Sequence, residues 1–197
     1  MRPVLLTGPR VLLREFTAED VDALTEIYGD PKVTEHMSFE PRTREQVAAT
    51  IAGVMQAAQA EPRIEYSLAG VLRDGRLIAF ARLAVDTQHP GQSSAQIGFA
   101  LRADRWGQGL GTEVVRLLLH LGFDELGLYR IWGARSPHNL ASAHLMAKLG
   151  MVEEGRIRGH LRVRGQWRDS IVHSILRPEW NDAETESGGS SQRNARP

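Results

Sequence analysis

A turn with three alternating glycines, followed at once by an apolar helical pattern, constrains this chain more than any other stretch. It reads DRWGQGLGTEV, from Asp104 to Val114, with glycine at positions 107, 109 and 111. Glycine lets the backbone approach a ligand closely, and a helix that begins there presents unpaired N–H groups and the positive end of its dipole. Such a helix start binds phosphate without a charged side chain. The glycine spacing alone is equally consistent with a turn that only begins a helix.

Two familiar phosphate-binding motifs do not fit this turn. A P-loop requires Gly-Lys-Ser/Thr, and the turn contains no lysine. A dinucleotide-binding fingerprint requires a third glycine where Thr112 stands, and it opens the first βα unit of its domain. Here several strand-like runs come before the turn. The stretch therefore predicts a phosphate site of another kind, or a turn without a ligand.

Strand and helix patterns are mixed along the chain. We expect strands in residues 10–16, 63–72, 76–85, 94–101, 128–135, 151–163 and 166–176. We expect helices in residues 17–30, 43–60, 112–126 and 139–150, and a loop from about residue 30 to 41. Arg73 to Arg76, with the sequence RDGR, has the pattern of a hairpin turn. This order of elements predicts an α/β or α+β fold with a mixed sheet.

The composition excludes several classes of protein. The chain has 197 residues, no cysteine and a formal net charge of zero, so we expect no disulfide, no thiolate metal site and no nucleic-acid partner. No apolar run approaches the roughly 18 residues of a membrane span, and the N-terminus does not have the pattern of a signal peptide. We expect a cytoplasmic protein with one domain over residues 1–181. Residues 182–197, DAETESGGSSQRNARP, are expected to be a disordered tail.

Several ordered motifs together resemble one enzyme family. AQIGFALRADRWGQGLGTEVVRLLL is followed about thirty residues later by RSPHNLASAHLMAKLGMVEEG. This arrangement resembles the GNAT superfamily of N-acetyltransferases, and most closely its RimJ/RimL-type branch of ribosomal-protein N-terminal acetyltransferases. The resemblance covers roughly residues 8–180. It implies a central mixed, mostly antiparallel twisted sheet of six to seven strands with about four helices, and acetyl-CoA as the acetyl donor.

The resemblance also implies where acetyl-CoA binds. The turn is implied to hold the pyrophosphate through backbone N–H groups, with Trp106 in place of the family's usual Gln or Arg. The strand before it is implied to diverge from its neighbour and to offer backbone groups to the pantetheine and the thioester carbonyl. Asn139 is implied to bind the pantetheine, although it can also cap a helix. The implied donor-binding residues are Phe99, Ala100, Leu101, Trp106, Gly107, Gln108, Gly109, Leu110, Gly111, Thr112, Asn139 and Ser142.

The chain departs from the family pattern at the acid and the base. Many members have a tyrosine acid where this chain has Met146. Glutamates that some members carry fall at Gly133 and Gln96. In the branch that the chain resembles, Ser142 is the suggested proton donor to the leaving thiolate.

Histidine has the pKa suited to general-base catalysis near neutral pH. His138 and His160 are therefore the preferred base candidates, although either could be a surface or packing residue. The other titratable candidates are Glu153, Glu154, Asp169 and His173, the last being expected to serve packing.

The absence of a strong base bears on the acceptor. An α-amino group has a pKa near 7.8 and a lysine amine one near 10.4, so a neutral lysine costs about 3.5 kcal/mol more at pH 7. We therefore expect a protein or peptide N-terminus, or a small-molecule amine such as an antibiotic or polyamine. A non-catalytic acyl-CoA-binding module is a third reading. Homodimers are common in such families.

One basic segment stands outside these motifs. In RIRGHLRVR, basic residues alternate with mostly apolar ones, so a strand there would carry one basic face. The alternating residues are Arg156, Arg158, His160, Arg162 and Arg164. The face could be an ordinary solvated surface, or it could attract an acidic substrate or RNA.

Overall fold

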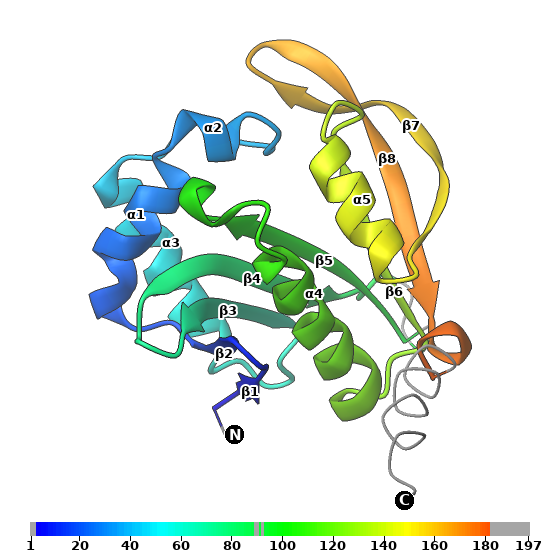
Figure 1. Ribbon diagram of the computed structural model, residues 1–197, viewed down its shortest axis with the longest axis horizontal. Helices are drawn as coiled ribbons and strands as arrows, with labels where there is room; N and C mark the ends of the chain where they lie inside the picture. The colour runs from blue at the N-terminus through cyan, green and yellow to red at the C-terminus, as the bar shows by residue number, and fades with distance from the viewer. Residues whose placement is uncertain (1–2, 89–90, 92, 182–197) are drawn as a thin grey trace, which may run out of the picture.

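The computed structural model describes residues 3–88, 91 and 93–181 (Figure 1). Its strands form one sheet in the order β1-β2-β3-β4-β5-β6-β8-β7. The strands are β1 (Leu5–Thr7), β2 (Val11–Glu15), β3 (Glu65–Leu72), β4 (Leu77–Val85), β5 (Ser94–Leu101), β6 (Arg130–Arg135), β7 (Val152–Val163) and β8 (Gln166–Leu176). The α-helices are α1 (Val21–Tyr28), α2 (Pro31–Thr34), α3 (Arg44–Ala57), α4 (Leu110–His120) and α5 (Leu140–Lys148). The expected tail, residues 182–197, lies outside the described residues.

The sheet is mixed, as the sequence predicts. Every neighbouring pair is antiparallel except β5 with β6. The expected six to seven strands and four helices undercount the described part of the chain. The additional strand is β1, three residues long, which shows no alternating pattern of its own. The additional helix is α2, a single turn within the segment expected to be a loop, begun by Asp30, whose Oδ1 accepts the N–H of Lys32 at 2.8 Å. Residues 177–181 add a further helical turn.

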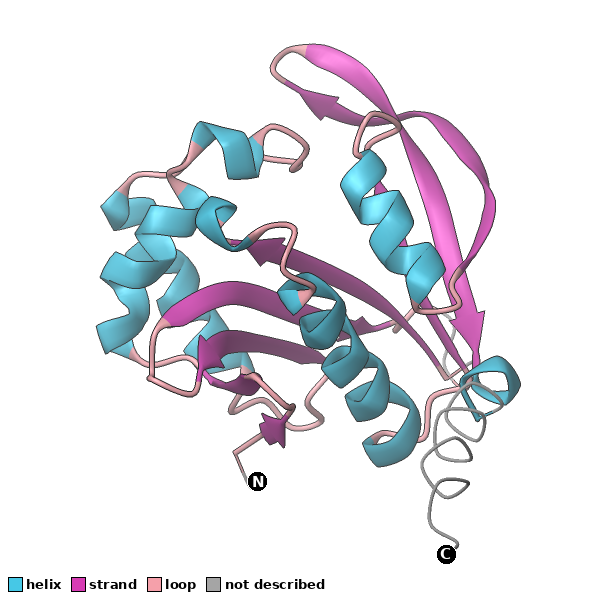
Figure 2. Cartoon of the chain, viewed as in Figure 1, coloured by secondary structure: helices cyan, strands magenta, loops and turns pink. Residues whose placement is uncertain are grey.

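Helices cover both faces of the sheet (Figures 1 and 2). Helix α4 packs on one face against apolar side chains that include Leu13, Leu68, Ile78 and Leu83. Helices α1 and α3 pack on the other face against a second set that includes Ala69, Val71 and Phe80. Because both faces are covered, β3 is buried from Tyr66 to Val71 without alternation. This two-sided burial makes the centre of the sheet a rigid platform for the strand β5.

Local signals set the boundaries of the elements. A capping box begins α3, because Thr43 N–H donates to Gln46 Oε1 at 2.9 Å and Thr43 Oγ1 accepts from Gln46 N–H at 3.4 Å. The predicted hairpin between β3 and β4 is confirmed, with Gly75 at φ +87° in its turn. Turns of this kind require positive φ, which glycine adopts without strain.

Candidate active site

The two parallel strands in the middle of the sheet diverge. Strands β5 and β6 are paired only from Ser94 with Arg130 to Gln96 with Trp132. Beyond that point β5 stays paired with β4 up to Leu101 but not with β6. One edge of β5, from Ile97 onward, therefore keeps backbone groups that no neighbouring strand binds.

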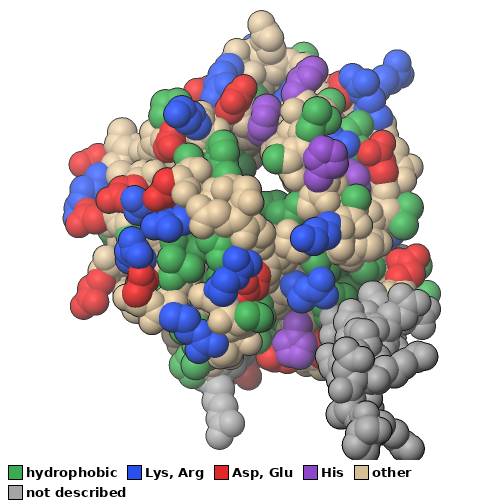
Figure 3. Space-filling model, in the orientation of Figure 1, with side chains coloured by type: hydrophobic (Ala, Val, Ile, Leu, Met, Phe, Trp, Pro, Cys, Tyr) green, Lys and Arg blue, Asp and Glu red, His purple; other side chains and the backbone are tan. Residues whose placement is uncertain are grey.

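The divergence opens a cleft of about 1050 Å³. The cleft is lined by β5, the end of β6, the glycine turn before α4, helix α5, the segment around α2, and the paired strands β7 and β8. Figure 3 shows a hollow near the middle of this face, with histidine side chains gathered beside it. The glycine turn lies at one end, which we call the donor end. The α2 segment and the β7–β8 pair lie at the other, which we call the acceptor end.

The glycine turn has the backbone conformation that its sequence predicts. Gly107 and Gly109 have φ of +73° and +75°, and Gly109 is the N-cap of α4. Gly111 serves a different need, since a Cβ there would lie 3.0 Å from Leu145 Cδ1 on α5. Two glycines thus shape the turn and the third lets α4 approach α5. The result is a bare helix N-terminus at the wall of the cleft.

Contacts from distant parts of the chain hold this turn. Trp106 Nε1 donates to the Leu101 carbonyl at 2.8 Å, which joins the turn to the end of β5. Arg10 Nη1 donates to the Gln108 carbonyl at 2.9 Å. The Glu113 carboxylate accepts the backbone N–H groups of Arg10 and Val11 at 2.6 and 2.8 Å. Glu113 therefore fastens the start of α4 to the start of β2.

Glu113 is expected to make the stability of the protein pH-dependent. Burial opposes its ionisation, but the N–H groups of Arg10 and Val11 and the Arg10 guanidinium outweigh this and lower the pKa of Glu113. A carboxyl group with a lowered folded-state pKa stabilises the protein above its ordinary pKa, and this stability is lost as pH falls through the folded value. Glu113→Gln should cost about 1 to 3 kcal/mol at pH 7 and less at pH 4. Urea unfolding at both pH values measures this difference, and the exposed Glu125→Gln should show neither effect.

The N-terminus of α5 forms the second wall of the donor end. Asn139 is its N-cap, and Asn139 Oδ1 accepts the Ser142 N–H at 3.0 Å. The capping role anticipated for Asn139 is therefore present. Both residues line the cleft, with Ser142 half-buried.

A buried arginine holds the turn that leads into α5. Arg135, at the end of β6, donates from Nη1 to the carbonyls of Ser136 and Pro137, each at 3.2 Å. Its Nε donates to His173 Nε2 at 3.0 Å, and its Nη2 donates to the Glu153 carboxylate at 3.1 Å. Because arginine can only donate, His173 Nε2 must accept, which requires the neutral ring with its proton on Nδ1. Burial and the nearby Arg135 charge lower the pKa of His173, in agreement with a neutral ring.

Removing the hydrogen bonds of Arg135 should weaken binding of the expected donor, acetyl-CoA. Arg135→Met deletes four hydrogen bonds, two of them to carbonyls of the turn, and a hydrogen bond to a charged group contributes about 1.5 to 3 kcal/mol. We expect the KM for acetyl-CoA to rise about tenfold, because Asn139 and Ser142, which the family resemblance implies bind this donor, lose their support. Arg130→Met is the matched control, since Arg130 lies on the same strand but pairs with Glu154 outside the cleft. An equal rise in KM in both variants would show that the effect is general destabilisation.

The structure separates the titratable candidates into two groups. Ser142, His138 and His160 line the cleft. His160 Nδ1 lies 2.9 Å from Ser170 Oγ, a hydroxyl on β8 that is buried. This contact orients the ring and leaves Nε2 for a ligand.

The remaining candidates do not line the cleft. Glu154 binds Arg130 and Ser174, and these hydrogen bonds lower its pKa to about 2. Asp169 binds Arg156 and the N–H of Gly159. Glu153 and His173 are both hydrogen-bonded to Arg135. Sequence reasoning missed His36 and Arg168, which line the acceptor end. Both lie in segments that match the family, but no local pattern singles out either residue, and Arg168 reaches the cleft through the pairing of β8 with β6 and β7.

The donor-binding residues expected from sequence are mostly brought together. The side chains or backbone of Phe99, Ala100, Leu101, Trp106, Gly107, Gly109, Gly111 and Thr112 line the cleft. Gln108 and Leu110 do not. Leu110 is buried in the core, and Gln108 is exposed with its carbonyl bound by Arg10.

The uninterrupted basic face expected for residues 156–164 is not formed. The pairing of β7 with β8 shifts between Ile157 and Leu161, where Gly159 has φ +55°. Arg164 has φ +51° and lies in the turn beyond the strand. A β-bulge of this kind redirects the side chains around it. It brings His160 to the cleft, whereas Arg156 pairs with Asp169.

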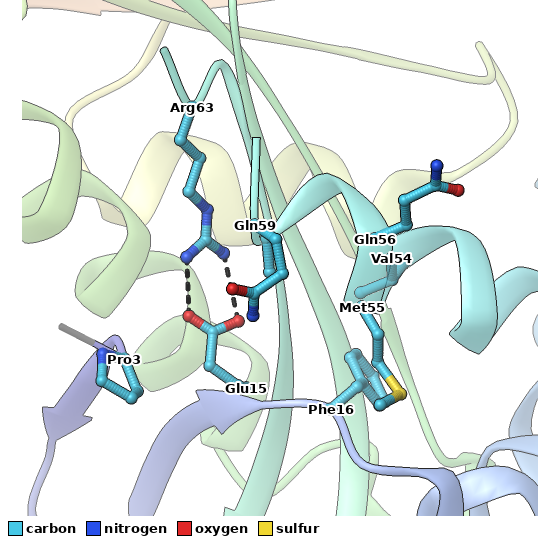
Figure 4. Close-up of a pocket in the computed structure, with 9 residues that line it drawn as sticks. Pro3, Glu15, Phe16, Val54, Met55, Gln56, Gln59 and Arg63 are labelled. Atoms are coloured by element: carbon cyan, nitrogen blue, oxygen red, sulfur yellow. Dashed lines mark hydrogen bonds and ion pairs between the residues drawn. The ribbon is translucent and has the colours of Figure 1, made fainter. Parts of the chain in front are cut away.

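A second, smaller hollow of about 360 Å³ lies between the end of α3 and β2 (Figure 4). Its charged groups bind each other, because Arg63 Nη1 and Nη2 donate to the two carboxylate oxygens of Glu15 at 2.7 and 3.1 Å. Arg63 is also stacked on the Tyr66 ring, 4.4 Å from its centroid. These contacts satisfy the polar groups without a ligand, so this hollow is structural.

Two further observations, on metal binding and on membrane-spanning helices, apply to residues 3–88, 91 and 93–181. Among these residues, no three His, Asp or Glu side chains are grouped so that they could hold a metal ion. None of the helices over the same ranges combines the length and the apolar character that crossing a membrane requires.

Known proteins resemble this chain over most of its length. The family model of the acetyltransferase (GNAT) domain matches residues 10–152. The N-acetyltransferase p20 of Bacillus licheniformis, itself uncharacterised, is 29% identical over 87% of this chain and 95% of its own length. Mycobacterium smegmatis RimJ, solved in complex with CoA-disulfide, superposes with a TM-score of 0.78 at 24% identity over 91% of each chain.

Two shorter matches have named acceptors. The ribosomal protein uS5-alanine N-acetyltransferase of Escherichia coli is 30% identical over 43% of each chain. The spermidine N(1)-acetyltransferase of the same organism is 27% identical over 44% of this chain and 46% of its own. The matched relatives thus include one enzyme that acts on a protein and one that acts on a polyamine.

Proposed function

Since this chain belongs to the GNAT acetyltransferase family and is therefore an N-acetyltransferase, we propose that it transfers acetyl from acetyl-CoA to the α-amino group of a protein or peptide N-terminus. The observation that carries the proposal is the meeting of three features in one cleft. A bare helix N-terminus, an unpaired strand edge and the His160–Ser170 pair all face the same space. The family's use of acetyl-CoA fits the first two features, and the third supplies a candidate base.

The donor end supports binding of acetyl-CoA by backbone groups. The N–H groups at the start of α4 suit a pyrophosphate, because a helix N-terminus attracts anions. The free edge of β5 suits a pantetheine arm, which can pair with a strand as another strand does. Backbone N–H groups of Phe99 to Leu101 are suitably placed to donate to the thioester carbonyl oxygen as it becomes negative.

The proton transfers require a base and an acid. The neutral amine attacks the thioester carbonyl carbon, the C–N bond forms, and the C–S bond breaks. His160, through Nε2, is the preferred acceptor of the proton that the amine loses, and His138 is the rival candidate. Ser142 donates a hydrogen bond or a proton to the sulfur as it leaves. A CoA thiol with a pKa near 8.5 is a good leaving group, so the Ser142 contribution is expected to be smaller than that of the base.

The proposed acceptor follows from the weak base. An imidazole can deprotonate an α-amino group at pH 7 far more readily than a lysine side chain. The relative named as a ribosomal protein uS5-alanine N-acetyltransferase supports this choice, because alanine has no side-chain amine and can offer only an α-amino group. The membership in an enzyme family argues against a module that only binds acyl-CoA.

An acceptor panel tests the proposal. Purified protein and acetyl-CoA are incubated with tetrapeptides, an Nα-blocked lysine peptide, spermidine and an aminoglycoside, and the products are identified by mass spectrometry. We expect acetylation at the peptide α-amino group and little at the blocked lysine peptide. Turnover of spermidine or the aminoglycoside with none on any peptide would overturn the proposed acceptor while leaving the acetyltransferase assignment intact.

A further inference from the structure

The acceptor end of the cleft contains a cation, Arg168, that has no carboxylate partner among the described residues. Arg168 extends from β8 into the cleft and is half-buried. Its Nη1 donates to the carbonyls of His36 and Met37, both at 3.0 Å. Its Nε is buried and has no hydrogen-bond partner among the described residues. Within those residues no acidic side chain forms an ion pair with Arg168, so part of its guanidinium is left for a ligand.

The other charges at this end do not cancel Arg168. Arg82 is neutralised by a two-point ion pair with Glu65, each contact 3.0 Å long. At the exposed rim Lys32 and Glu35, both on or next to α2, have opposite charges. Coulomb interactions strengthen away from bulk water, so the half-buried Arg168 sets the sign of the field that an acceptor meets.

The strand geometry relates Arg168 to the candidate base. Arg168 and Ser170 are two residues apart on β8, so their side chains lie on the same face about 7 Å apart along the strand. Ser170 holds the ring of His160. Because Ser170 touches His160, Arg168 is displaced from the candidate base by this two-residue step along β8, toward the loop that follows α2, whose carbonyls it binds. Figure 1 shows the β7–β8 hairpin and α2 on the same side of the molecule.

This spacing matches a peptide better than a free amino acid. An extended chain advances about 3.4 Å per residue, so the side chain of the second or third residue reaches Arg168 when the N-terminus lies at His160. The carboxylate of a free amino acid lies one carbon from the amine and falls short. A polyamine would bring further positive charge toward Arg168.

We propose that Arg168 selects acceptor peptides that carry an acidic side chain at their second or third position. The inference rests on the proposed peptide N-terminal activity and adds a specificity-determining residue to it. An Arg guanidinium binds a carboxylate through parallel N–H donors, which gives both charge and directional selectivity. Arg168 thus distinguishes acceptors after the donor site has accepted acetyl-CoA.

Isosteric peptide pairs test the inference. The C-terminally amidated peptides Ala-Asp-Ala-Ala and Ala-Asn-Ala-Ala form one pair, and Ala-Ala-Asp-Ala and Ala-Ala-Asn-Ala form the other. We expect the wild-type kcat/KM to favour the acidic member of at least one pair by about tenfold, mainly through KM. Arg168→Gln should reduce this ratio to about one, and Arg168→Lys should retain part of it.

The experiment measures the ratio of kcat/KM within each peptide pair, because Arg168 also donates hydrogen bonds to carbonyls of the loop after α2. A purely structural role would lower the rates for both members of a pair and leave their ratio unchanged. Arg162→Gln is the matched control, since Arg162 lies on the paired strand, is exposed and does not line the cleft. Thermal stabilisation by acetyl-CoA shows that each variant is folded.

Three results would count against the inference. Equal kcat/KM for Asp and Asn peptides in the wild type refutes acidic selectivity while the peptide activity stands. A higher kcat/KM for free alanine than for every amidated acidic peptide assigns Arg168 to the α-carboxylate of a free amino acid instead. Turnover of spermidine with no peptide product refutes the proposed function itself.

Discussion

Gly109→Val is expected to weaken acetyl-CoA binding by about 100-fold or more. Gly109 is the N-cap of α4 at φ +75°, a conformation that a β-branched residue adopts only with strain. Relaxing that strain would rotate the N–H groups that are expected to bind pyrophosphate. Losing one or two hydrogen bonds to a charged group, at about 1.5 to 3 kcal/mol each, corresponds to a change of this size. Isothermal titration of the folded variant with CoA measures it.

Gly75→Val is the control for this experiment. Gly75 also has positive φ, at +87°, and has open space around it, but it lies in the β3–β4 hairpin away from the cleft. The two substitutions should cause similar losses of thermal stability. Only the change at Gly109 should alter the Kd for CoA. Equal affinities in both variants would show that the glycine turn does not bind CoA.

His160→Gln is expected to lower kcat/KM for the acceptor by about 100-fold or more at pH 7 without changing the Kd for acetyl-CoA. Positioned general bases contribute about 10²- to 10⁴-fold to rates, and glutamine keeps a similar volume without accepting a proton. The buried Ser170 hydroxyl, 2.9 Å from Nδ1, orients the histidine. Steady-state kinetics with varied peptide and saturating acetyl-CoA measure the effect.

The rival base provides the decisive comparison. His138 also lines the cleft, but it is exposed, and no side-chain hydrogen bond orients it among the described residues. A large loss of kcat/KM in His138→Gln with little change in His160→Gln would identify His138, in the turn before α5, as the base. His120→Gln is the inert control, because His120, the last residue of α4, pairs with Asp124 in the following turn, outside the cleft.

The donor end could be predicted largely from local sequence. The positive φ values of Gly107 and Gly109 follow from alternating glycines ahead of an apolar helical repeat. The cap formed by Asn139 follows from its place before α5. These features depend on residues close together in the chain, so motif and periodicity carry the necessary information. The numbers of strands and helices are harder to predict, because β1 and α2 are too short to show a period of hydrophobic residues.

The acceptor end depends on contacts between residues far apart in the sequence. Glu153, Glu154 and Asp169 have suitable side chains for a base, yet ion pairs with arginines hold all three outside the cleft. The bulge in β7 could not be read from the alternation of residues 156–164, and it is the reason that His160 enters the cleft.

The sequence by itself therefore determined the family, the class of fold and the conformation of the glycine turn, because each is encoded in short ordered patterns. Only the tertiary structure decided which ionisable groups share the cleft. Strand register and bulges determine the direction of each side chain on β7 and β8, and these depend on pairing across the sheet rather than on neighbouring residues. In the proposed function the glycine turn binds the donor, and the register of β8 brings Arg168 to the cleft, where we propose that it selects the acceptor.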